Sequence, residues 1–190
     1  MITLKSHISI GYANTASVED IDIDDFRTQL DTNLLGVVYV SKAVLPILRQ
    51  QESGHIFQVS SLGGRLGVPG LAPYQSAKWA EVAPFGIKVT VLEPGGVRTD
   101  WAGSSMKVPP VSEPYQSTVG AFAGFLRKPS RSELSFPENI ADIVVKLTGK
   151  AEPPLRLLVG PDAVEYAGKA AEALAASDAK WRELSLTSSA

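Results

Sequence analysis

The longest periodic pattern of the chain covers residues 22–51 and predicts a helix. Apolar side chains recur there every three or four positions, which places them on one helical face. They are Phe26, Leu30, Leu34, Val37, Val38, Val44, Leu45 and Leu48. Acidic residues crowd its start, where free N–H groups and the helix dipole favour carboxylates. Pro46 is expected to bend or loosen the final turns, because it cannot donate to the helical ladder.

Short apolar runs bounded by glycine and proline predict strands. The clear runs are 55–60, 87–92 and 155–160, and a weaker one lies at 4–10. Helical patterns cover 74–83, 115–126, 139–150 and 162–184. A strand, helix and strand in succession imply a right-handed parallel crossover, so the fold class is α/β with a parallel sheet. We expect a single domain over residues 1–190, with a frayed tail at 185–190.

Composition and charge narrow the function classes. The formal net charge of −2 comes from interspersed acidic and basic residues, so neither nucleic acid nor an anionic membrane is an expected partner. The absence of cysteine excludes disulfides, thiolate metal sites and cysteine nucleophiles. His7 and His55 lie far apart, so no metal site is expected. The longest apolar run, 34–40, is too short to span a bilayer, and we expect a cytoplasmic protein.

Tyr74 and Lys78 are the first candidate pair for chemistry. Four residues apart on a helix, their side chains lie on the same face. A neighbouring ammonium favours the phenolate, which would lower the pKa of Tyr74 toward use as a proton shuttle beside a carbonyl or alcohol. Ser60 and Ser61, fourteen and thirteen residues upstream, lie at the end of a predicted strand. Since parallel sheets carry their chemistry at the carboxyl ends of strands, we expect one of these serines near this pair.

Four segments in order resemble motifs of the short-chain dehydrogenase/reductase family. They are Asn-Leu-Leu-Gly at 33–36, Val-Ser-Ser at 59–61, Tyr-Gln-Ser-Ala-Lys at 74–78 and Glu-Pro-Gly-Gly-Val-Arg-Thr at 93–99. The resemblance covers the chain from about Gly11 to the last helix. It implies a partial Rossmann-like, doubly wound parallel sheet. It also implies an NAD(P)-dependent oxidoreductase that interconverts a small-molecule carbonyl and alcohol, in a family whose members form homo-oligomers.

The resemblance also assigns roles to individual residues. Tyr74 would donate or accept the proton, and Lys78 would lower its pKa and hold the nicotinamide ribose. Ser61 would hydrogen-bond the substrate oxygen, and Asn33 would anchor a water that relays protons to Lys78. Asn33 has the alternative of satisfying a helix carbonyl. A hydride must come from bound NAD or NADP, because no side chain supplies one.

A second group of residues is implied to bind the cofactor or the substrate. The resemblance assigns the nicotinamide carboxamide to the segment containing Pro94, Gly95, Val97 and Thr99, although Thr99 could instead cap the following turn. Residues 101–135 would form a substrate lid. Five of its apolar residues either line a pocket or form ordinary core; they are Trp101, Met106, Tyr115, Phe122 and Phe125.

Two departures from the family keep other functions open. The chain shows no glycine-rich strand-turn-helix, and relative to the family it is expected to begin at the fourth strand. The helix that follows Lys78 is shorter than in the family by roughly ten residues, or about 15 Å. The alternatives are therefore a non-catalytic remnant, a fragment that docks on a partner through its sheet edge or long helix, or an incomplete gene model of an active enzyme.

Overall fold

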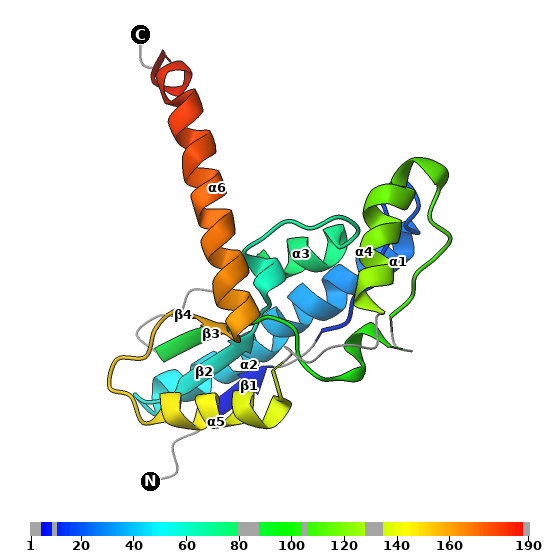
Figure 1. The fold of residues 1–190 in the computed structure, drawn as a ribbon. Helices are drawn as coiled ribbons and strands as arrows, with labels where there is room; N and C mark the ends of the chain where they lie inside the picture. Colours follow the sequence, from blue (N-terminus) through cyan, green and yellow to red (C-terminus); the bar gives the residue numbers. More distant parts are fainter. Residues whose placement is uncertain (1–4, 9–10, 80–87, 104–105, 128–134, 188–190) are drawn as a thin grey trace.

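The computed structural model describes residues 5–8, 11–79, 88–103, 106–127 and 135–187, and its centre is a parallel sheet (Figure 1). The strands are β1 (Lys5–Ile8), β2 (His55–Val59), β3 (Lys88–Pro94) and β4 (Arg156–Val159). They lie side by side in the order β1-β2-β3-β4, and all neighbours are parallel. This confirms the predicted α/β class, including the weak strand signal at 4–10.

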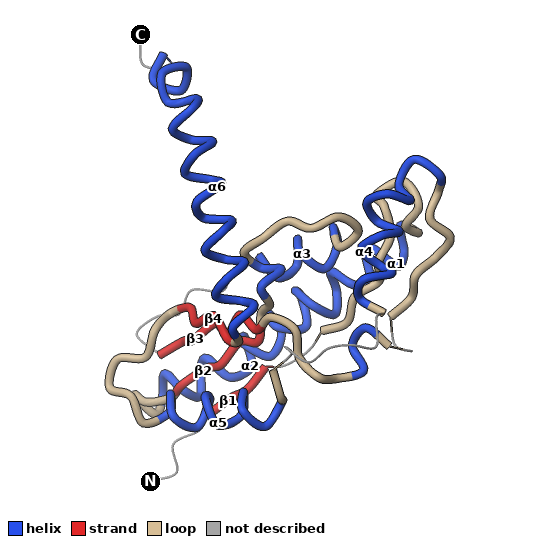
Figure 2. The backbone as a smooth tube through the Cα atoms, in the orientation of Figure 1, coloured by secondary structure: helices blue, strands red, loops and turns tan. Residues whose placement is uncertain are grey.

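Six α-helices accompany the sheet in the described part of the chain. They are α1 (Ile23–Leu30), α2 (Gly36–Gln50), α3 (Ala72–Trp79), α4 (Ala121–Leu126), α5 (Pro137–Thr148) and α6 (Pro161–Leu186). Figure 2 shows the strands gathered at one end of the molecule, with α1, α3 and α4 grouped at the other side. The predicted end of the Tyr74 helix near residue 83 lies outside the described residues.

Alternating side chains of the strands form two cores, one on each face of the sheet. Ile56 of β2 packs with Leu48 of α2, whereas its neighbour Phe57 packs with Leu147 of α5. All four side chains are at most 8% exposed. The alternation follows from the two-residue period of a strand, and it explains why these short apolar runs need helices on both faces.

The helix predicted over 22–51 runs from Ile23 to Gln50, but its α-helical hydrogen bonding is interrupted once. Asp22 caps it by accepting from the N–H groups of Asp24 and Asp25. A π-helical turn, Asp31–Leu35, separates α1 from α2. α2 continues through Pro46 to Gln50. The π turn was not predicted, because the periodicity of the sequence continues across it.

By length and composition alone, the helical stretch Ile23–Gln50 is apolar enough to cross a membrane. Four of its residues pack against the core around Leu48; they are Val37, Val40, Val44 and Leu45. The core helix of a soluble protein passes the same test of length and composition, so this stretch is weak evidence for a membrane span.

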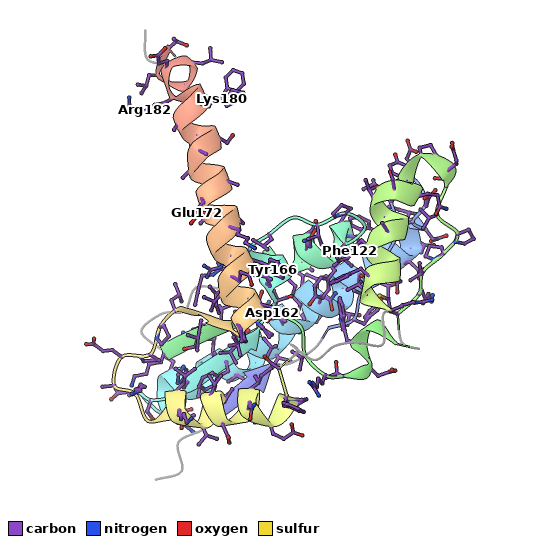
Figure 3. The ribbon with its side chains drawn as sticks, viewed as in Figure 1. Phe122, Asp162, Tyr166, Glu172, Lys180 and Arg182 are labelled. Carbon is purple, nitrogen blue, oxygen red and sulfur yellow. The ribbon has the colours of Figure 1, made fainter. Side chains whose placement is uncertain are left out.

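α6 is the most exposed element and projects from the body of the molecule (Figure 1). Only Ala163 and Ala167, near its start, are buried. Figure 3 shows Tyr166, Glu172, Lys180 and Arg182 spaced along it and pointing away from the axis. The first two residues of the expected frayed tail, Ser185 and Leu186, are helical. Residues 188–190 lie outside the described part.

Candidate active site

Ser61 and Tyr74 meet beyond the carboxyl end of β2. Ser61 follows this strand and begins a short turn, Leu62–Gly64, by accepting from the N–H of Gly63 at 3.1 Å. Tyr74 lies in the first turn of α3 and is only 7% exposed. Burial raises the pKa of Tyr74 above 10.0, while the hydrogen bond from Ser61 to the phenol oxygen opposes this rise. The serine is therefore placed to stabilise negative charge on that oxygen.

Lys78 lies one helical turn after Tyr74 and is almost fully buried. Its Nζ donates to the carbonyl of Val59 at 2.9 Å and lies 5.8 Å from the centre of the Tyr74 ring. Burial lowers the pKa of Lys78 to about 8, since the protein interior disfavours the ammonium. The expected lowering of the Tyr74 pKa by Lys78 was wrong for this structure: burial of the phenol dominates, and the net direction is upward.

Asn33 sits in the π turn with its side chain directed at the loop after β1. Its Oδ1 accepts from the N–H of Tyr12 at 3.1 Å, and its Nδ2 donates to the carbonyl of Tyr12 at 2.9 Å. The alternative role, satisfying a helix carbonyl, is not what these contacts show. A π turn shifts the following residues by one position, and such turns are frequent at functional sites.

Gly11 lies close to the side chains of both Asn33 and Lys78. A Cβ built on Gly11 would lie 3.1 Å from Lys78 Nζ and 3.3 Å from Asn33 Oδ1, which is tighter than ordinary contact. A small pocket beside them is lined by both side chains together with Gln58, Ser60 and Ala77. Asn33, Ser61, Tyr74 and Lys78, the four predicted catalytic residues, thus lie around the carboxyl end of β2.

Ser60 has a different task from its neighbour Ser61. Its hydroxyl donates to the backbone carbonyl of Lys78 at 3.0 Å, which ties the end of α3 to β2. Gly64 packs against this bond, because a Cβ there would come within 2.5 Å of Ser60 Oγ and 2.7 Å of the Lys78 carbonyl. Ser60 therefore holds the helix, while Ser61 faces Tyr74.

The segment predicted to cover the nicotinamide follows β3 directly. The Gly95 N–H donates to the carbonyl of Val159 at 3.0 Å, and the N–H of Gly96 donates to Asp162 Oδ2 at 2.6 Å. Val97 forms a parallel bridge with Ser135. Figure 3 places Asp162 at the base of α6, beside the ends of the strands. The backbone after Pro94 is thus fixed by β4 and the start of α6.

In this structure Thr99 caps the turn that follows it, which is the alternative that its sequence position left open. Its Oγ1 accepts from the N–H of Trp101 at 3.3 Å and caps the turn Asp100–Ala102. The side chain is exposed. The turn that it caps carries Trp101, whose ring lies 5.5 Å from the ring of Tyr74, centre to centre. Thr99 therefore connects to the site through Trp101.

Three of the five apolar lid residues pack around Tyr74. Trp101, Met106 and Phe122 belong to one cluster with the tyrosine, and Figure 3 places Phe122 between α4 and α3. Phe125 is 57% exposed, and Tyr115 instead interacts with Glu19, which raises the pKa of Tyr115. Three of the five residues named for the lid therefore pack around Tyr74, and the other two do not belong to this cluster.

Sequence reasoning missed a buried acidic residue, Glu93, at the end of β3. Its carboxylate is fully buried and pairs with Arg65 and Arg156. A carboxylate inside an apolar strand is itself a signal, because a buried charge needs a partner. Which arginines supply that partner depends on tertiary contacts that no spacing encodes.

A nicotinamide cofactor, the group implied by the resemblance, needs donors for its sugar hydroxyls and a site for its pyrophosphate. Lys78, which the resemblance assigns to the sugar hydroxyls, has its Nζ close to Gly11, where an added Cβ would come within 3.1 Å of it. Within the described residues, no glycine-rich turn joins a strand to a helix in the way that a pyrophosphate site needs. The described residues therefore include the tyrosine and lysine that the resemblance assigns to the nicotinamide end, without a turn of the kind that holds a pyrophosphate.

A parallel sheet with serine, tyrosine and lysine beyond its carboxyl end defines a Rossmann-like α/β protein with a candidate active site. The sequence profile of the short chain dehydrogenase family matches residues 8–108, and the chain belongs to this family. It is 75% identical over 188 residues to "Oxidoreductase BOA17" of Botryotinia fuckeliana (strain B05.10), covering 94% of this chain and 69% of that protein.

Solved structures agree with the fold. A short-chain dehydrogenase from Streptomyces avermitilis superposes with a TM-score of 0.86 at 26% identity, over 97% of this chain and 70% of that one. An actinorhodin polyketide ketoreductase variant solved with NADPH has a TM-score of 0.62 at 25% identity, over 82% of this chain and 65% of that one. Against two further curated oxidoreductases, the chain spans only 55% and 58% of the relative's length. The predicted family and fold class are confirmed.

Proposed function

We propose that this chain carries the catalytic part of an NAD(P)-dependent oxidoreductase that interconverts a carbonyl and an alcohol. The observation that carries the proposal is the meeting of Ser61, Tyr74 and Lys78 beyond β2, with the phenol and the ammonium both buried. Ionisable groups with shifted pKa values gather at functional sites, because chemistry needs them there and packing does not. Membership in the short chain dehydrogenase family supports the same reaction class.

The proton chemistry follows from the environment of Tyr74. The phenol of Tyr74 is protonated at neutral pH and can donate a proton to the oxygen of a carbonyl substrate. Burial raises its pKa and makes it a weaker acid, and the hydrogen bond from Ser61 acts in the opposite direction. Ser61 would donate a hydrogen bond to the substrate oxygen as negative charge develops on it. The bound nicotinamide cofactor would supply or accept the hydride.

Lys78, one helical turn after Tyr74, and Asn33 would support this transfer. With a pKa of about 8, Lys78 is mostly protonated at neutral pH and can return a proton at little cost. The pocket that both side chains line is the place for the relaying water expected at Asn33. Trp101, Met106 and Phe122 would exclude bulk water from the phenol.

Cofactor titration tests the proposal. We expect purified protein to bind NADPH or NADH saturably, read by the fluorescence of the reduced nicotinamide, and to reduce members of a panel of apolar ketones. Tyr74→Phe keeps the shape of the ring but removes the proton, so it should retain cofactor binding while turnover falls by about 10²- to 10⁴-fold. Absence of saturable binding for both cofactors at millimolar concentration would refute the proposal.

A second candidate function, binding of a protein partner without catalysis, is favoured by α6. Leu174, Trp181 and Leu184 are each more than half exposed on this projecting helix. Exposed apolar side chains on an unpartnered helix are typical of an interaction surface. Sedimentation velocity tests the version of this candidate in which the partner is a second copy of the chain: a monomer at all concentrations would exclude self-association through α6.

A further inference from the structure

Glu93 is the most completely buried charge beside the candidate active site. It precedes Pro94 at the carboxyl end of β3, and its side chain has no exposed surface. Oε1 accepts from Arg156 through Nε at 2.8 Å and also through Nη2. Oε2 accepts from Nη2 of Arg65. Both carboxylate oxygens therefore hold an arginine, and each arginine comes from a different part of the chain.

The two arginines connect Glu93 to the turn that carries Ser61. Arg65 directly follows the turn Leu62–Gly64, and its N–H donates to the carbonyl of Leu62 at 2.9 Å. Arg156 reaches the turn from β4, since its Nη2 also donates to the carbonyl of Gly64 at 3.2 Å. The far end of the turn is therefore held by both arginines, through one carboxylate.

The near end of the same turn is Ser61. The carbonyl of Ser61 accepts from the N–H of Gly64 at 2.9 Å, and its Oγ accepts from the N–H of Gly63 at 3.1 Å. Because the turn is only three residues long, a displacement of Gly64 or Arg65 moves the hydroxyl that faces Tyr74. A side chain that fixes the far end of the turn thus fixes the serine.

We propose that Glu93 is a positioning residue, which through Arg65 and Arg156 sets the place of Ser61 against Tyr74. The inference rests on the proposed oxidoreductase function for its catalytic consequence, but its geometric part concerns the chain alone. Glu93 is also joined covalently to the Pro94–Gly95 backbone. It therefore fixes the serine turn relative to the segment that would cover the nicotinamide.

The variant Glu93→Gln tests the inference in the enzyme. The amide keeps the shape of the side chain but carries no charge, and its NH2 group in place of one carboxylate oxygen cannot accept from an arginine, so the restraint on the turn weakens. Misplacement of a reacting group by about 1 Å can cost 10²-fold in rate. We expect kcat for ketone reduction to fall by up to about 100-fold with little change in the KM for NADPH, because the lost contact acts on the substrate oxygen.

Titration of the Tyr74 phenol by NMR, with tyrosine labelled at the ring carbon bearing oxygen, tests the inference without turnover. Tyr74→Phe assigns the signal. Ser61→Ala should raise the pKa of Tyr74, since the hydrogen bond from Ser61 lowers it. If Glu93 positions Ser61, Glu93→Gln should raise it too. An unchanged titration in Glu93→Gln would overturn the inference, whether or not Ser61→Ala shifts it.

Two further variants separate positioning from general stability. Arg65→Met removes one of the two arginines and leaves the ion pair between Arg156 and Glu93. If Glu93→Gln does not fold, Arg65→Met replaces it in the titration, and we expect a smaller rise in the pKa of Tyr74. Leu147→Ala weakens the core on the α5 face and should leave the Tyr74 titration unchanged. A shift in Leu147→Ala equal to that in Glu93→Gln would show a merely structural role. Failure of cofactor binding with these shifts intact would refute only the proposed function.

Discussion

Replacing Gly64 by alanine is a sharp test of how closely the serine turn packs on α3. The added Cβ would lie 2.5 Å from Ser60 Oγ and 2.7 Å from the carbonyl of Lys78. Ser60 can rotate away, but then its hydrogen bond to that carbonyl is lost, which costs about 0.5–1.5 kcal/mol. The carbonyl belongs to the backbone and must move by about 0.7 Å to reach ordinary contact, and overpacking of this kind costs about 1–3 kcal/mol.

The free energy of unfolding should therefore fall by about 1.5–4.5 kcal/mol in Gly64→Ala. Urea unfolding followed by circular dichroism measures it. Gly67→Ala is the matched control, because nothing lies within 4 Å of a Cβ at that position in the same loop. Reduced freedom of the unfolded chain should leave this control unchanged or more stable by about 0.4–1 kcal/mol.

Equal midpoints for Gly64→Ala and Gly67→Ala, with equal denaturant slopes, would refute the reasoning. They would mean that the turn is free to move away from α3. In that case Ser61 would also be free to leave Tyr74, and the site would not be preorganised. A loss of stability confined to Gly64→Ala would instead support a rigid connection between the turn and the helix that carries the phenol.

Three further variants probe the polar contacts of the site. Lys78 has a pKa of about 8 in the folded protein, against an ordinary value of 10.5. Between these two pH values the unfolded chain binds more protons than the folded one, so the free energy of unfolding rises with pH. Lys78→Met should remove this rise, which urea unfolding at pH 7 and pH 9.5 measures. Asn33→Ala leaves both backbone groups of Tyr12 without a partner and should cost about 1–3 kcal/mol, whereas an unchanged midpoint would contradict the importance of these bonds. In Gly95→Ala the new Cβ would overlap the carboxylate of Asp162 and should cost about 1–3 kcal/mol relative to the glycine-to-alanine control above; a midpoint equal to that control would show that the carboxylate moves aside freely.

The sequence predicted those elements whose pattern is set locally. Strands β2, β3 and β4 came from apolar runs of the right length between glycines and prolines, and the helix over 22–51 came from its periodicity. The π turn at Asp31–Leu35 could not be predicted in this way. Its extra residue is held by the side chain of Asn33 on the backbone of Tyr12, which is a contact between positions 21 residues apart.

The candidate site was predictable in its composition and not in its electrostatics. The spacing of Ser61, Tyr74 and Lys78 predicted that these residues lie close together, because a strand end and a helix turn have fixed geometry. The direction of the Tyr74 pKa was wrong, since it depends on how much of the phenol Trp101 and its neighbours cover. Glu93 was missed as an acceptor for two arginines for the same reason: burial is a tertiary property.

The burial of Lys78 favours a chemical role for this side chain over a role in packing alone. A pKa lowered from 10.5 to about 8 means that folding with a protonated lysine at neutral pH costs about 3 kcal/mol relative to an ordinary environment. A methionine fills a similar volume without that cost, so packing alone does not favour lysine here. Proteins carry such unfavourable local choices where function requires them. If Lys78→Met proves more stable at pH 7 than the unchanged protein, stability cannot be the reason for the lysine, and proton transfer at Tyr74 is the role that its position supports.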